Sequence, residues 1–170
     1  QNDFKYIEPW YSSVNQLGLE GRIFYDNLSD EFLEKYTTDK IKFIKVIPSD
    51  YSNNDWRFFC YRNYLEENKF DSVFLTDGSD VTVVKDPSQI ITEFCDTDLF
   101  VCKDSIMLNE FAYLDLHQQV GWDDYVLFSI MSGRWELINM GVIGGNYNNI
   151  MLFLNQFYLI KKHMTSKCKL

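Results

Sequence analysis

The stretch from Phe70 to Pro87, FDSVFLTDGSDVTVVKDP, constrains the fold of this chain more than any other part of the sequence. Its first apolar run, Val73 to Leu75, ends abruptly in an acidic turn that contains Gly78. This pattern predicts a buried strand that stops at the turn, followed by a second short strand over Val81 to Val84. Open α/β sheets bind ligands at the carboxyl ends of their strands, so the turn is a candidate ligand-binding site.

Asp77 and Asp80 stand in this turn and are candidate metal ligands. Two carboxylates placed by a glycine turn can bind a hard divalent cation through oxygen, and such a cation commonly carries a substrate diphosphate. The alternative is an ordinary turn between strands, because Asp and Gly are common turn residues. The position of the pair at the end of the apolar run favours the metal site.

Length and composition predict one globular domain spanning residues 1–170. With 46% hydrophobic and 17% aromatic residues, the chain falls outside the disordered class. The formal net charge of -9 argues against broad nucleic-acid binding, which needs a basic surface. The excess of acidic residues does not exclude an anionic ligand, because a bound metal ion reverses the sign of the local electrostatic field.

The 4 cysteines form no Cys-x-x-Cys pair and the 2 histidines lack metal-finger spacing, which argues against a zinc module. Scattered cysteines favour a reducing compartment, and we expect a cytoplasmic location. The sequence shows no signal peptide and no membrane span. Because the chain begins with Gln1 rather than Met, we expect it to be a piece of a longer protein.

Apolar periodicity predicts alternating strands and helices, and therefore an α/β fold with a largely parallel sheet. The predicted strands cover Arg22 to Tyr25, Lys40 to Ile47, Val73 to Leu75, Leu99 to Cys102 and Leu137 to Gly145. Helices are predicted to begin at Pro9, after the cap Ser29 and after Ser52 to Asp55. Further helices are predicted in parts of Asp104 to Glu136 and over Tyr147 to Ile160, and Ile90 to Phe94 is predicted to be a short helix or a turn. The tail from Lys161 is expected to fray.

Several familiar motifs are missing from the sequence. The GxGxxG and Gly-Lys-Ser/Thr phosphate motifs are absent, as is the G-x-S-x-G nucleophile elbow.

Trp10 has the spacing of a core residue, which favours packing over sugar binding. Arg57 is either a surface arginine or a cation that faces a phosphate near the acidic turn, and the sequence leaves both interpretations open.

Three segments in order resemble the GT-A glycosyltransferases, most closely the small enzymes of that fold encoded by chlorella viruses. They are Asn54 to Phe58, then Thr76 to Val81 with Asp86-Pro87, and then Leu137 to Gly145 before an apolar helix. The resemblance runs from Tyr6 to Phe157. It implies a single GT-A (Rossmann-like) domain with a mostly parallel central sheet flanked by helices.

In that family an Asp-x-Asp motif holds a divalent metal, usually Mn²⁺ and otherwise Mg²⁺, which bridges the donor diphosphate. This chain has Asp-x-x-Asp instead. The resemblance makes Asp80 the direct metal ligand, and makes Asp77 a second ligand or a contact to the ribose or to a metal-bound water. The residues that it assigns to the nucleotide and donor sugar are Arg57, Thr76, Asp77, Gly78, Asn139, Gly144 and Gly145.

The chain departs from the family at both ends. The family's first strand, which contacts the nucleotide base, should lie upstream of Tyr6. A further substrate-contacting segment usually follows the helix after the Gly-Gly run. We therefore expect the domain to lack its first strand and its C-terminal segment.

The resemblance implies metal-dependent transfer of a sugar from a nucleoside-diphosphate sugar, with UDP preferred, to a hydroxyl of a glycan acceptor. A viral protein of this kind would act in the host cytoplasm. The metal would offset negative charge on the departing diphosphate.

A retaining enzyme needs no general base, whereas an inverting one needs a carboxylate for the acceptor hydroxyl. We prefer Asp123 and Asp124, beside Trp122, for that role; the other candidates are Asp104, Glu110 and Asp115.

Two other classes of function stay open at this point. One is a non-catalytic domain that binds a nucleotide sugar or a glycan. The other is a metal-dependent phosphatase or nucleotidyltransferase, which also uses aspartates at strand ends.

Overall fold

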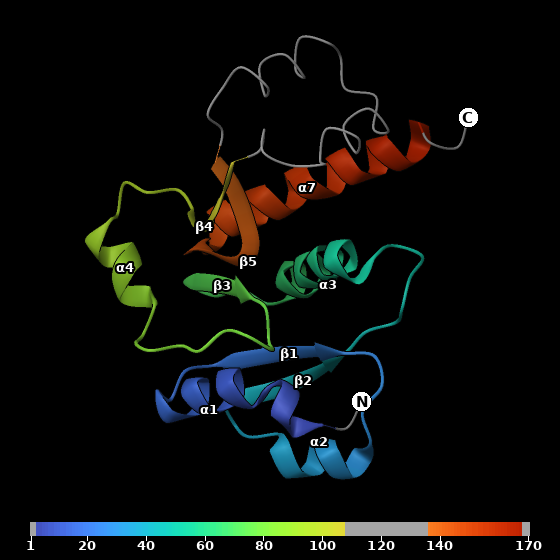
Figure 1. Cartoon of the computed structure of the whole chain (residues 1–170), viewed down its shortest axis with the longest axis vertical. Helices are drawn as coiled ribbons and strands as arrows, with labels where there is room; N and C mark the ends of the chain where they lie inside the picture. The colour runs from blue at the N-terminus through green and yellow to red at the C-terminus, as the bar shows by residue number, and fades with distance from the viewer. Residues whose placement is uncertain (1–2, 108–135, 168–170) are drawn as a thin grey trace.

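The computed structural model describes residues 3–107 and 136–167, and these residues form a mixed α/β fold (Figure 1). Strands β1 (Gly21–Tyr25) and β2 (Ile41–Lys45) pair in parallel as one sheet. Strands β3 (Ser72–Thr76), β5 (Glu136–Asn146) and β4 (Phe100–Met107) form a second, antiparallel sheet in the order β3-β5-β4.

The prediction of one mostly parallel sheet is therefore wrong for the described strands, although the prediction of an α/β fold is confirmed. An apolar run of strand length indicates burial but carries no information on the direction of its partner. That direction is set by long-range pairing, here between β3 and β5.

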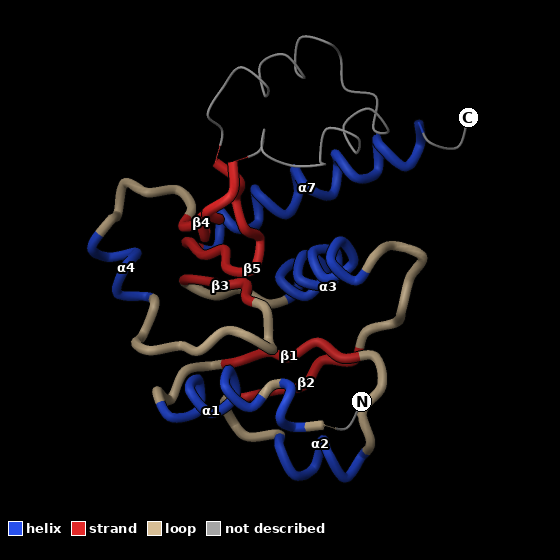
Figure 2. Tube along the Cα trace, viewed as in Figure 1, coloured by secondary structure: helices blue, strands red, loops and turns tan. Residues whose placement is uncertain are grey.

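The N-terminal helices lie beside the β1–β2 sheet (Figures 1 and 2). A short 3-10 helix, η1 (Phe4–Tyr6), leads into α1 (Glu8–Gln16), which has a proline in its first turn. Helix α2 (Asp30–Tyr36) begins at Ser29, whose hydroxyl accepts a hydrogen bond from the Phe32 amide at 3.3 Å. Both helices lie where the sequence predicts them.

The main core lies between the antiparallel sheet and two long helices, α3 (Asn53–Glu67) and α7 (Tyr147–Lys167). These helices run side by side in Figures 1 and 2. Helix α3 is capped by the Ser52 hydroxyl, which accepts from the Asp55 amide at 3.2 Å. The buried members of this core are Phe58, Leu65, Leu75, Ile143, Ile150 and Leu154.

Strand β3, which its apolar run predicts to be buried, is an edge strand of its sheet. Strand β5 is the central strand, and it pairs with β3 on one side and β4 on the other. Gly144 of β5 lies opposite Phe74 of β3 in this pairing. A Cβ atom at Gly144 would stand 2.1 Å from Cδ1 of the Phe74 ring, so glycine lets this ring lie flat against β5.

Three local predictions are wrong. The run Val81 to Val84 is not a strand: the Val83 amide donates to the Ser13 hydroxyl of α1 at 3.0 Å, and the Val84 side chain is 84% exposed. Its β-branched residues fit a strand, but no described strand pairs with them.

Residues 104–107, predicted within a helical segment, belong to β4. Helix α7 continues through Lys167 instead of fraying at Lys161. Helix α4 (Ser88–Glu93) overlaps the segment Ile90 to Phe94, which is predicted to be a short helix or a turn.

Within residues 3–107 and 136–167, none of the helices has both the length and the apolar character that a membrane crossing requires.

Replacing Gly144 with alanine should destabilise the fold by about 1–3 kcal/mol, because the added methyl group overlaps the Phe74 ring. Gly78→Ala is the matched control, since its nearest contact would be Ile7 at an ordinary 3.9 Å. Urea denaturation of both variants measures the difference. A Gly144→Ala variant as stable as Gly78→Ala would contradict the packing described for β3 and β5.

Candidate functional site

The carboxyl end of β3 brings together the three sequence segments that carry the resemblance. Arg57 of α3 forms an ion pair with Asp77, which directly follows β3. The Asp77 amide donates to the Gly141 carbonyl of β5 at 2.8 Å. The Arg57 guanidinium also donates to the Met140 carbonyl at 3.4 Å, so one arginine joins α3, β3 and β5.

Asn139 and Gly141 complete this polar cluster on β5. The Asn139 side-chain oxygen accepts from the Gly141 amide at 2.7 Å. A Cβ atom at Gly141 would lie 2.8 Å from that oxygen and 2.9 Å from Oδ2 of Asp77. Glycine at this position therefore allows two polar side chains to approach the backbone closely.

Asp80 is exposed on the turn, whereas Asp77 is partly buried. In the part of the chain that the structure describes, no group of three or more His, Cys, Asp or Glu side chains could hold a metal ion. One oxygen of Asp77 faces the Arg57 cation, which disfavours a second cation there. Metal binding by Asp80 and Asp77 therefore stays a prediction.

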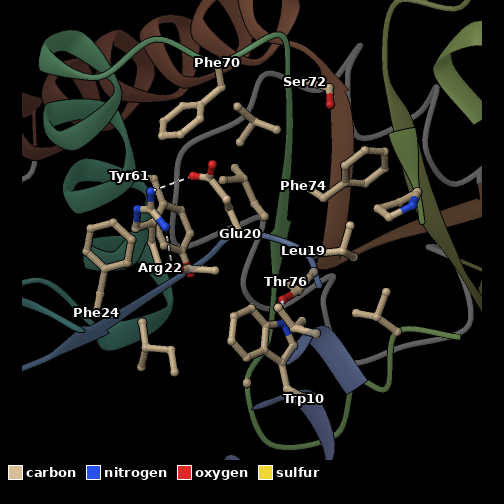
Figure 3. A pocket seen from close by; sticks show the side chains of 18 of the residues that line it. Trp10, Leu19, Glu20, Arg22, Phe24, Tyr61, Phe70, Ser72, Phe74 and Thr76 are labelled. Carbon is tan, nitrogen blue, oxygen red and sulfur yellow. Dashed lines mark hydrogen bonds and ion pairs between the residues drawn. The ribbon is translucent and has the colours of Figure 1, made fainter. Parts of the chain in front are cut away.

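A cavity of about 540 Å³ opens beside this cluster, between β1 and β3 (Figure 3). Arg57, Thr76 and Gly78 contribute to its lining. The Trp10 indole N–H donates to the Thr76 hydroxyl at 2.8 Å, and a Cβ atom at Gly21 would lie 2.7 Å from the Trp10 ring. Trp10 therefore has the packing role that its spacing predicts.

Tyr61 lines the same cavity, and burial raises the pKa of its hydroxyl above the ordinary value of 10.0. The nearby Arg57 cation opposes this effect, and Cys60 adds to it. The Tyr61 ring packs edge-on against Phe24 of β1, with the ring centres 5.1 Å apart. Its hydroxyl therefore stays protonated at neutral pH.

The structure does not bring all the predicted site residues into this cluster. Gly144 and Gly145 are buried in β5, where glycine admits the Phe74 ring and the Asp98 carbonyl. Their predicted contact with a donor sugar stays a prediction. Asp123 and Asp124, like Glu110 and Asp115, lie outside the described residues, and nothing is described of the Asp104 side chain in β4.

Sequence reasoning missed the backbone contributions to the site. The carbonyls of Met140 and Gly141 accept hydrogen bonds from Arg57 and Asp77, respectively. A glycine inside the apolar run LINMGVIGG was the available signal for a close approach of other groups at this point.

Comparison with known proteins adds no relative: no family model, no curated protein and no solved structure matches this chain.

The Arg57–Asp77 pair should be more strongly coupled than an ordinary surface ion pair. A double-mutant cycle with Arg57→Met and Asp77→Asn should give a coupling free energy of about 1 kcal/mol or more, because Arg57 and Asp77 are each also hydrogen-bonded to the β5 backbone. The control is the i,i+4 pair Arg62–Glu66 on α3, for which about 0.3–0.5 kcal/mol is expected. Equal coupling in the two cycles would show that the first pair does not organise the site.

The stability of the protein should fall as the pH rises above about 10, partly because of Tyr61. The folded state retains a proton that the unfolded state loses, since burial raises the Tyr61 pKa only in the folded state. Tyr61→Phe should reduce this alkaline loss of stability. Tyr6→Phe is the control, because Tyr6 is 63% exposed. Urea denaturation at neutral pH and above pH 10 measures the effect, and equal losses in both variants would contradict it.

Proposed function

We propose that this protein is a metal-dependent glycosyltransferase that takes its sugar from a nucleoside-diphosphate donor, with UDP preferred, and passes it to a hydroxyl of a glycan acceptor. The observation that carries the proposal is the meeting of Arg57, Asp77 and the Met140–Gly141 backbone. These groups come from three segments that resemble GT-A glycosyltransferases and lie far apart in the sequence.

The chemistry of the cluster suits a diphosphate donor. Asp80 would hold a divalent cation, Mn²⁺ or Mg²⁺, through its exposed carboxylate, with phosphate and water oxygens as the other ligands. The cation would offset negative charge on the departing diphosphate. Asp77 is paired with Arg57 and lies beside Asn139, and these groups would orient the ribose or the donor sugar.

Positioning and electrostatics would supply most of the rate enhancement in such a site. Arg57 lines the cavity, with 22% of its side chain exposed, and would add positive charge beside the diphosphate. Asp123 and Asp124 remain the proposed bases for an inverting reaction, and a retaining reaction would need neither.

Calorimetric titration of UDP with and without Mn²⁺ tests the proposal. Binding should require Mn²⁺, and Asp80→Asn should weaken it by about tenfold or more, because losing one charged ligand costs on the order of 1.4 kcal/mol. Asp71→Asn is the matched control, since Asp71 is exposed at the opposite end of β3. It should bind UDP like the unchanged protein.

Turnover assays separate this proposal from its alternatives. Release of UDP from a UDP-sugar supports transfer or donor hydrolysis, whereas metal-dependent binding without turnover would indicate a binding domain. Release of phosphate or pyrophosphate would favour a phosphatase or nucleotidyltransferase. UDP binding that is unaffected by both Mn²⁺ and Asp80→Asn would contradict the proposed metal site.

A further inference from the structure

Helix α7 exposes three large aliphatic side chains. Leu152, Leu159 and Ile160 are 60%, 57% and 57% exposed, respectively. Leu159 and Ile160 follow Leu152 by about two helical turns, so the three side chains project from one side of the helix. The opposite side of α7, with Ile150 and Leu154, is buried in the core against the antiparallel sheet and α3. Core packing therefore explains one apolar side of α7 and leaves the outer side unexplained.

The same end of the chain is basic. After Glu136 the sequence contains no Asp or Glu, and its charged residues are Lys161, Lys162, Lys167 and Lys169. Lys161 pairs with Asp55 of α3 at 2.9 Å, whereas Lys162 is exposed beside Leu159 and Ile160 in the sequence. Lysines near a helix C-terminus favour the helix dipole. That effect accounts for the lysines but not for the exposed aliphatic side chains next to them.

The residue types on the outer side of α7 distinguish a lipid surface from a protein partner. Protein interfaces are enriched in aromatic residues and arginine and depleted in lysine. Helix α7 has no arginine, and its aromatic residues Phe153 and Phe157 pack against the core instead of pointing outward. Exposed Leu and Ile beside Lys are typical of a helix that lies at a lipid surface, where the aliphatic groups enter the acyl boundary and the lysines reach the headgroups.

The charge distribution of the chain would orient it on such a surface. The whole chain has a formal net charge of -9, and all of its acidic residues lie at or before Glu136. An anionic membrane would repel the acidic part and attract the basic end, over a distance of about 8 Å at physiological ionic strength. Repulsion and attraction therefore act together to turn the outer side of α7 toward the lipid.

From these observations we propose that the outer side of α7 binds the surface of a membrane that contains anionic lipids. The helix lies along the headgroups, Leu152, Leu159 and Ile160 enter the acyl boundary, and Lys162 contacts the anionic headgroups. This inference is independent of the proposed function, because it uses no residue of the cluster around Asp77.

Vesicle sedimentation of the full chain tests the proposal. The probes are vesicles of phosphatidylcholine and phosphatidylserine in equal parts, with phosphatidylcholine alone for comparison. The test variants are Lys162→Gln and the double substitution Leu159→Gln with Ile160→Gln. Val84→Gln is the matched control, because Val84 is 84% exposed and lies outside α7. Each substituted position is exposed, so the variants should fold like the unchanged protein, which circular dichroism checks.

The unchanged protein and Val84→Gln should bind the phosphatidylserine vesicles at low salt and lose most of this binding at high salt. The double substitution should weaken binding by about tenfold or more, and Lys162→Gln by about fivefold. Failure of the unchanged protein to bind at low salt would overturn the proposal, as would equal binding by the double substitution and Val84→Gln. Light scattering that shows a dimer dissociated by the double substitution would overturn it in favour of a second copy on this face.

Discussion

The pairing of β3 with β5 is the interaction on which the rest of the described structure depends. It sets Leu75 and Ile143 opposite each other in the ladder, inside the core that α3 and α7 close. It also places Asp77 against the Gly141 backbone at the end of the ladder. Because neighbouring side chains alternate between faces, a slip of one residue would move every side chain of β3 to the other face. The register is fixed in part by Gly144, where only glycine leaves space for the Phe74 ring.

The pairing of β3 with β5 also determines the positions of the residues in the candidate site. Arg57 is carried by α3, whose Phe58 and Leu65 side chains are buried in the same core as Leu75 of β3. The guanidinium therefore reaches Asp77 from a fixed direction and does not depend on a surface loop. The β1–β2 half is connected differently, through side chains that border the cavity, such as Trp10 with Thr76 and Arg22 with Tyr64.

Much of the local structure could be predicted from the sequence, because local signals determine it. Ser29 and Ser52 cap the helices that follow them, and the stripe from Ile150 to Phe157 marks the core face of α7. Long-range features could not be predicted in the same way. The direction of β5 and the edge position of β3 depend on pairing partners that an apolar run does not specify. The types of Arg57 and Asp77 suggested a site. Their spacing in the sequence did not reveal that the two side chains form a pair, or that the β5 backbone takes part in the same cluster.

The proposed function requires that the turn after β3 binds a divalent cation together with a nucleotide diphosphate. Crystals grown with Mn²⁺ and UDP test it most directly, through an anomalous difference map measured at the manganese edge. We expect a peak at coordination distance from an Asp80 carboxylate oxygen and from the UDP diphosphate, with Asp77 still paired to Arg57. Bound UDP with no manganese peak, or with the peak away from Asp80, would contradict it.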